Sequence, residues 1–88
     1  MNEFFFKAIR EGSINEVRSM LDKNPVLVNS KDTRGSTPLI LATYYDEMEI
    51  AKLLLEKGAK IDAVDASGNT ALMGVCFKGF TDIAKLLI

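Results

Sequence analysis

Histidine is absent from this 88-residue sequence, and cysteine occurs once, at Cys76. A single cysteine cannot form a disulfide within the chain. Without histidine it also lacks the base of the Cys-His pair that activates a catalytic thiol. The sequence around it, GVCFKG, has an apolar, helical character. We therefore expect Cys76 to be a small buried hydrophobic residue rather than a nucleophile.

The sequence also lacks an excess of either charge and a long apolar run. The formal net charge is −1 and lysine and arginine are not clustered, which argues against a nucleic-acid partner. No stretch is long enough to cross a bilayer, so no membrane partner is expected and the cytoplasm is the default location. Asp62 and Asp65 lack the dense oxygen spacing of a calcium loop, and the glycines are spread along the turns. We expect no metal, no cofactor and no catalysis.

What the sequence does contain is an internal repeat. A shift of 33 residues places Asp32 on Asp65 and GSTPLILA on GNTALMGV, and the match continues into a shared AKLL near the end of each segment. A fixed period of this length is the signature of a repeat architecture. The chain is therefore predicted to be one domain of stacked units.

Each unit is predicted to be a turn followed by two short helices. Thr37 fits a helix N-cap, and Pro38 fits the first helical position, where its missing N–H costs nothing. The first helix should end at Asp46, because aspartate tolerates a left-handed conformation better than most residues. A second helix is expected in MEIAKLLLEK, with Gly58 as its C-terminal cap.

The N-terminal segment fits the same unit in a less regular form. Its helices align when Gly12 is placed on Asp46, and Asn24 then falls on Gly58 and is expected to be the left-handed cap. The segment NPVLVNSKD is one residue longer than its counterpart GAKIDAVD. The extra residue is expected in a loop, where insertions are tolerated. The FFF triplet should be partly buried against the second unit, with at least one ring outward.

At GSTPLILA and LLLEKGAKIDAVD the sequence resembles the ankyrin repeat, which shares the period, the T-P-L-x-x-A helix entry and the G-A-x-I-D-A turn. The resemblance implies an all-α solenoid of helix-turn-helix units joined by β-turn loops, about two and two-thirds repeats long. We predict a single domain over residues 1–88 with an N-terminal cap repeat at 1–31, a second repeat at 32–64 and a truncated third at 65–88. The family's histidine after T-P-L is Ile40 here and Met73 in the next unit, so its polar bonds must be absent or replaced.

The resemblance also implies that turn tips and first helices line a concave face that binds a partner protein. The turn residues not required by the turn or the helix caps are Thr33, Arg34, Ser36, Ala66, Ser67 and Asn69. Near the end of the first helix, two adjacent positions can be compared across the three units. The first position, the aromatic column, holds Arg10, Tyr44 and Phe77, and the second holds Glu11, Tyr45 and Lys78. Aromatic residues and arginine are enriched at binding hot spots. The predicted partner surface therefore combines these turn residues with Arg10, Tyr44, Tyr45, Phe77 and Lys78.

The aromatic column leaves two interpretations open, which are contact with a partner and packing between repeats. Adjacent residues of a helix point about 100° apart. One of Tyr44 and Tyr45 is therefore expected to face the groove and the other to pack within the stack. The sequence does not decide which of the two faces the groove.

The third unit stops before its second helix is complete, which should leave an apolar face without a following repeat: Leu72, Val75, Ile83, Leu86 and Leu87. Three explanations would account for this end: the chain is a fragment of a longer array, the end pairs with another copy, or the continuation is disordered. The first is favoured, because the helix is cut at no physical boundary. The alternatives to a simple interaction module are a regulatory or targeting segment of a larger multidomain protein and a scaffold that self-associates as an end-to-end homodimer.

Overall fold

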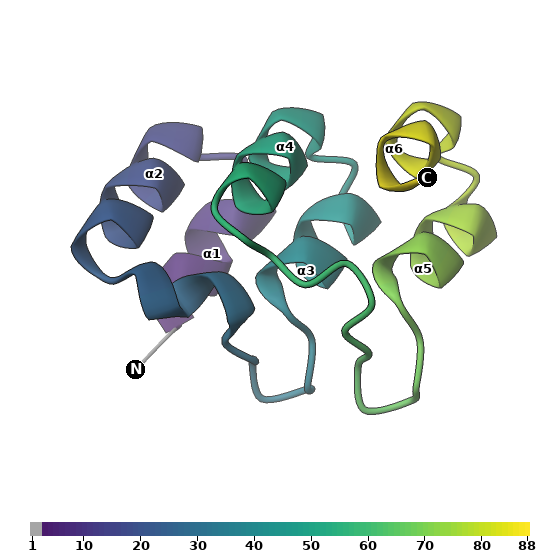
Figure 1. Ribbon diagram of the computed structural model, residues 1–88, viewed down its shortest axis with the longest axis horizontal. Helices are drawn as coiled ribbons and strands as arrows, with labels where there is room; N and C mark the ends of the chain where they lie inside the picture. The colour runs from purple at the N-terminus through teal and green to yellow at the C-terminus, as the bar shows by residue number, and fades with distance from the viewer. Residues whose placement is uncertain (1–2) are drawn as a thin grey trace.

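The computed structural model describes residues 3–88, which form a stack of helix pairs (Figure 1). The pairs are α1 (Glu3–Arg10) with α2 (Ile14–Lys23), α3 (Pro38–Tyr44) with α4 (Met48–Glu56), and α5 (Ala71–Lys78) with α6 (Thr81–Leu87). A 3-10 helix, η1 (Pro25–Asn29), follows α2. Met1 and Asn2, the first residues of the predicted first repeat, lie outside the described residues.

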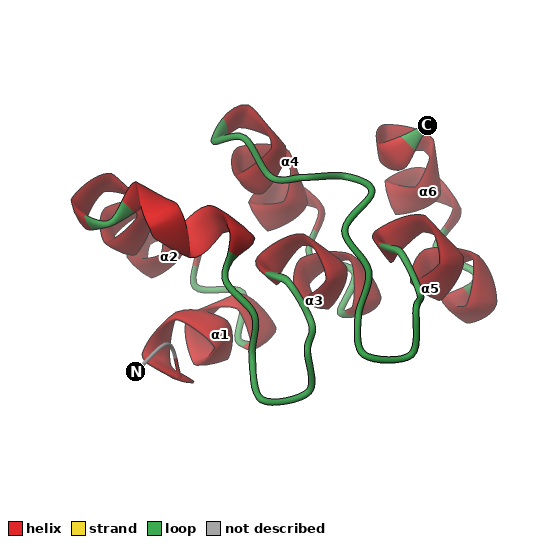
Figure 2. Ribbon diagram, turned by 60° about the horizontal axis from the view of Figure 1, so that its bottom comes forward, coloured by secondary structure: helices red, strands yellow, loops and turns green. Residues whose placement is uncertain are grey.

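The first and second helices of the pairs form two layers. Helices α1, α3 and α5 lie side by side in one layer, and α2, α4 and α6 form the other (Figure 2). The two long loops project to the same side of the stack. Residues 3–88 contain no β-strand, so the all-α prediction is confirmed. One helix pair falls in each predicted repeat, and the repeat boundaries within the loops stay a prediction.

The core runs between the two layers. In α4, Ile50, Leu53 and Leu54 are buried on one face, at the spacing of three and four residues that a helix requires. Removing a side chain of this size from water stabilises the fold by about 1.5–3 kcal/mol. In the FFF triplet of α1, two rings are buried and Phe4 is 75% exposed, as predicted.

Threonine caps begin α3 and α5 in the same way. Thr37 Oγ1 accepts a hydrogen bond from the Ile40 amide at 3.2 Å, and Thr70 Oγ1 accepts one from the Met73 amide at 3.3 Å. Helix α3 also has Pro38 at its start, whereas α5 begins without a proline. The predicted N-cap is confirmed, and the threonine is the feature that both helices share.

A left-handed residue separates the two helices of each pair. Gly12, Asp46 and Gly79 have φ values of 74°, 57° and 77°. In the second pair, the residue after the break donates its amide to Ala42 O at 2.8 Å, which reaches back into α3 and fixes the angle between the helices. The predicted break at Asp46 is confirmed.

Replacing Asp46 with glycine should raise the free energy of unfolding by about 0.5–1 kcal/mol, because glycine adopts a positive φ without a Cβ penalty. The Asp46 side chain is exposed and makes no hydrogen bond within residues 3–88. Urea denaturation followed by circular dichroism measures the change. Asp46→Ala is the control and should lower stability, because alanine keeps the penalty without aspartate's tolerance for this conformation. A glycine variant no more stable than the parent protein would contradict the prediction.

The cap predicted at Asn24 is wrong. Asn24 has a φ of −144°, whereas Gly58 has a φ of 95° and follows the end of α4 as predicted. The cause is Pro25, because the ring of a proline pushes the preceding residue toward an extended conformation. The segment that follows forms η1 rather than the loop that was expected to hold the extra residue.

Cys76 is exposed, so the prediction of a buried residue is also wrong. Its counterpart in the second unit, Thr43, is fully buried, because α5 packs against α3. Helix α5 packs on α3 and α6, and its outer side is uncovered in this structure. A residue that is buried in the middle of the stack is therefore exposed on α5.

The predicted apolar end face has a different composition from the one expected. Val75, Ile83 and Leu87 are buried within the described stack, and Leu72 and Leu86 are partly buried. The large hydrophobic side chains exposed on α5 and at the end of α6 are Met73, Phe77 and Ile88. The expectation that these five residues form an exposed face is therefore wrong, because they serve the core of the third helix pair, and the end-to-end homodimer stays a prediction.

A candidate protein-binding groove

Two turns of the same construction carry the loop tips. Asp32 Oδ1 accepts hydrogen bonds from the amides of Arg34 and Ser36, both at 2.9 Å. In the next loop, Asp65 Oδ1 accepts from the amides two and four residues further on, again at 2.9 Å. Asp65 therefore bonds within its own turn, as Asp32 does in the first. These carboxylates supply polar bonds in the turns of a chain that has no histidine.

The first loop is tied to the second by side-chain hydrogen bonds. Asn29 accepts from the Lys60 amide at 2.9 Å and donates to Gly58 O at 3.3 Å. Lys31 Nζ donates to Val64 O at 3.3 Å. Because all three bonds join segments about thirty residues apart, they fix the spacing of the loops. The tips are therefore held in place before any partner arrives.

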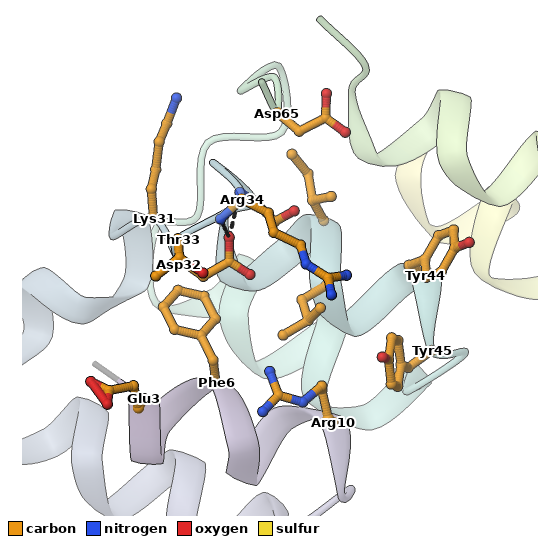
Figure 3. Close-up of a pocket in the computed structure, with 13 residues that line it drawn as sticks. Glu3, Phe6, Arg10, Lys31, Asp32, Thr33, Arg34, Tyr44, Tyr45 and Asp65 are labelled. Atoms are coloured by element: carbon orange, nitrogen blue, oxygen red, sulfur yellow. Dashed lines mark hydrogen bonds between the residues drawn. The ribbon is translucent and has the colours of Figure 1, made fainter. Parts of the chain in front are cut away.

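A groove of about 860 Å³ lies between the loop tips and the first helices (Figure 3). It is lined by six of the predicted partner residues: Arg10, Thr33, Arg34, Ser36, Tyr44 and Tyr45. A smaller hollow of about 360 Å³ shares Tyr44 with it and continues along α5 to Asn69 and Phe77. The structure thus brings residues from two loops and three first helices to one surface.

Tyr44 and Tyr45 both line the groove, so the prediction that one packs within the stack is wrong. They are 43% and 45% exposed, and their ring centroids lie 6.0 Å apart at an angle of 48°. Tyr45 is the C-cap of α3, where the backbone leaves helical geometry, so the 100° rule for adjacent residues no longer applies. Tyr44 lies beside α5, with Lys78 Nζ 4.8 Å from its ring centroid and Gly74 next to the ring.

The other predicted residues lie at the margins of the groove. Ala66 and Ser67 are exposed on the second tip and line neither hollow, and Lys78 meets the site through its contact with Tyr44. Phe77 is 86% exposed at the edge of the smaller hollow. Because the outer side of α5 is uncovered, this exposure is compatible with both interpretations of Phe77, contact with a partner and packing between repeats.

Sequence reasoning missed an apolar floor. Ile40 and Leu41 line the groove and are partly buried, and Ile40 also lines the smaller hollow. Ile40 occupies the place of the family's histidine, and it precedes Tyr44 by one helical turn. That spacing was the signal in the sequence, because residues four apart share a helix face.

The charges of the groove are not paired with one another. Arg10 and Arg34 form no ion pair within residues 3–88. The ion pairs that the described residues form, Lys52–Glu49 at 3.5 Å and Lys57–Asp22 at 3.4 Å, lie on or beside the second helices. The groove therefore presents two guanidinium groups without a carboxylate partner of their own.

The described residues contain no cluster of three side chains that could hold a metal ion. No helix in this part of the chain is long and apolar enough to cross a membrane.

A family model described as "Ankyrin repeats (3 copies)" matches residues 5–88. Ankyrin repeat and SAM domain-containing protein 6 of Mus musculus is 36% identical over 84 residues, which is 94% of this chain and 10% of the relative. Probable E3 ubiquitin-protein ligase XBOS33 of Oryza sativa subsp. japonica is 33% identical over 87 residues, which is 98% of this chain and 17% of the relative. NAD-capped RNA hydrolase NUDT12 of Homo sapiens is 36% identical over 83 residues, which is 94% of this chain and 18% of the relative.

The chain spans less than a fifth of the length of these relatives. The match extends over all six α-helices of the described structure, from within α1 to the end of α6. The resemblance seen in the sequence is confirmed, and the chain belongs to the ankyrin-repeat family.

Proposed function

We propose that this chain is a non-catalytic interaction module that binds a segment of a partner protein in the groove between the loop tips and the first helices. Ankyrin repeats generally mediate protein–protein interaction. The observation that carries the proposal is the pair of half-exposed tyrosines, Tyr44 and Tyr45, side by side in a groove that also contains two arginines. Tyrosine and arginine are the residue types that dominate binding energy at interfaces.

The rigidity of the groove supports the same proposal. The Asn29 and Lys31 bonds hold the tips, so a partner does not have to order them on binding. Preorganisation of this kind raises affinity by lowering the entropic cost of association. A cytoplasmic location stays part of the proposal.

A second candidate is that the chain serves as a regulatory or targeting segment of a larger protein. It is favoured by the relatives, which are several times longer and include proteins named as a ubiquitin ligase and an RNA hydrolase. In both candidates the groove binds protein, and they differ in whether the bound segment belongs to another chain. Self-association is the third possibility, and light scattering of the purified chain tests it directly.

Substituting alanine for Tyr44 or Tyr45 should weaken peptide binding at least about tenfold, because hot-spot truncations cost more than about 1.4 kcal/mol. The peptides would be selected from a phage-displayed random library against the parent protein, and their dissociation constants measured by fluorescence anisotropy. Phe4→Ala is the matched control, because Phe4 is an exposed aromatic residue that does not line the groove. Equal affinities for the three variants and the parent would contradict the proposal.

A further inference from the structure

Two arginines from different elements converge on the groove. Arg10 is the last residue of α1, and Arg34 lies at the tip of the first turn. Both line the groove; Figure 3 shows the guanidinium group of Arg34 extending toward Tyr44 and Tyr45, and that of Arg10 lying between Tyr45 and Phe6. Both arginines are exposed, and neither is held by a carboxylate of residues 3–88. They are therefore available to a ligand.

The lining of the groove contains three acidic residues, Glu3, Asp32 and Asp65, and three basic residues, Arg10, Lys31 and Arg34. Asp32 and Asp65 each have one carboxylate oxygen occupied by two backbone amides of the turn, which binds them into the loop structure. Glu3 lies at the outer end, away from the tyrosines (Figure 3). Arg10 and Arg34 are thus the charged side chains that lie nearest the aromatic surface (Figure 3).

The surfaces beside the arginines limit what can bind. Tyr44 and Tyr45 present half-exposed rings, and Ile40 and Leu41 form an apolar floor. A guanidinium binds a carboxylate through two parallel hydrogen bonds, and aromatic rings accept an apolar side chain. A chain that carries a carboxylate next to an apolar residue satisfies both parts of the surface at once.

On the basis of the proposed function, we infer that the partner segment is acidic. An Asp or Glu side chain lies between Arg10 and Arg34, and a neighbouring apolar side chain packs against Tyr44, Tyr45 and Ile40. The arginines set the orientation of the bound segment in the groove and its preference for negative charge. The tyrosines supply most of the buried apolar area.

The probe is a phage-displayed library of random peptides, selected in parallel against the parent protein and against a variant with Arg10→Glu and Arg34→Glu. The parent should enrich peptides with Asp or Glu beside Leu, Phe or Tyr, and the charge-reversed variant should enrich Lys and Arg instead. For the best parent peptide, Arg10→Gln and Arg34→Gln should each weaken binding about tenfold. Arg34→Lys should fall between, because lysine keeps the charge and loses the two-pronged geometry.

Arg18→Gln is the matched control, because Arg18 is an exposed arginine of α2 that does not line the groove, and it should bind within about twofold of the parent. Thermal melts of all variants show that the fold is intact. Peptides that depend on Tyr44 and Tyr45 but show no acidic preference would overturn this inference and leave the proposed function standing. A selection that yields no groove-dependent peptide would overturn both.

Discussion

Replacing Leu54 with alanine should lower the free energy of unfolding by about 2–5 kcal/mol, because the change removes buried methyl groups and leaves a cavity. Leu54 is 0% exposed and lies in α4, which packs on both α3 and α2. An 88-residue chain is expected to be stable by roughly 4–13 kcal/mol in total. A single substitution here therefore removes a large share of the stability, which urea denaturation followed by circular dichroism would measure.

Leu55→Ala is the matched control for this prediction. Leu55 has the same chemistry and lies in the same helix, but it is only partly buried because it is rotated by about 100° from Leu54. Leu55→Ala should lower the free energy of unfolding by less than about 2 kcal/mol, because folding removes less of the Leu55 side chain from water than of the Leu54 side chain. Equal costs at the two positions would mean that α4 does not face the core as described.

The helix pairs could be predicted from the sequence because the local signals agree with one another. The period of 33 residues repeats the threonine cap, the turn glycine and the apolar stripe together. Thr37 and Thr70 begin their helices as expected, and Asp46 takes the left-handed position. When the N-cap, the left-handed residue after the helix and the apolar face all indicate the same helix, its position can be predicted without knowledge of the tertiary contacts.

Two errors in the fold have different causes. Asn24 was assigned from its aligned position, although the rule that a residue before proline avoids helical geometry was available from the sequence. Cys76 could not be placed in this way, because its burial depends on whether another helix covers the outer side of α5. Periodicity gives the apolar stripe of a helix and does not say how many of its sides have neighbours.

The candidate site was predicted in its membership better than in its geometry. The turn residues were identified because folding does not require them, and the aromatic column because aromatic residues and arginine are enriched at binding hot spots. Six of these residues line one groove. The orientation of Tyr45 depends on its place at the end of α3, which is a boundary that sequence fixes poorly. Arg10 and Arg34 line the same groove because α1 packs beside the first loop. The spacing of residues in the sequence does not predict this packing.

Gly35→Ala should destabilise the protein by roughly 2–4 kcal/mol, and Gly68→Ala should cost only about 1–2 kcal/mol. The two glycines occupy the same place in successive turns and share a φ of 82°, so the backbone penalty of a Cβ is the same. They differ in their surroundings, because a Cβ at Gly35 would stand 3.1 Å from Ala66 N and 3.2 Å from Ala66 Cβ. A Cβ at Gly68 would meet nothing within 4 Å.

The difference between these two variants measures the contact between the loop tips, because the shared backbone penalty cancels. Ala66→Gly should recover part of the cost of Gly35→Ala, since it removes the Cβ contact and leaves the contact with the backbone nitrogen. The same substitution should not rescue Gly68→Ala. Chemical denaturation of the variants and double variants gives the comparison. If Gly35→Ala and Gly68→Ala cost the same, the tips do not touch in solution, and the groove is less rigid than its hydrogen bonds indicate.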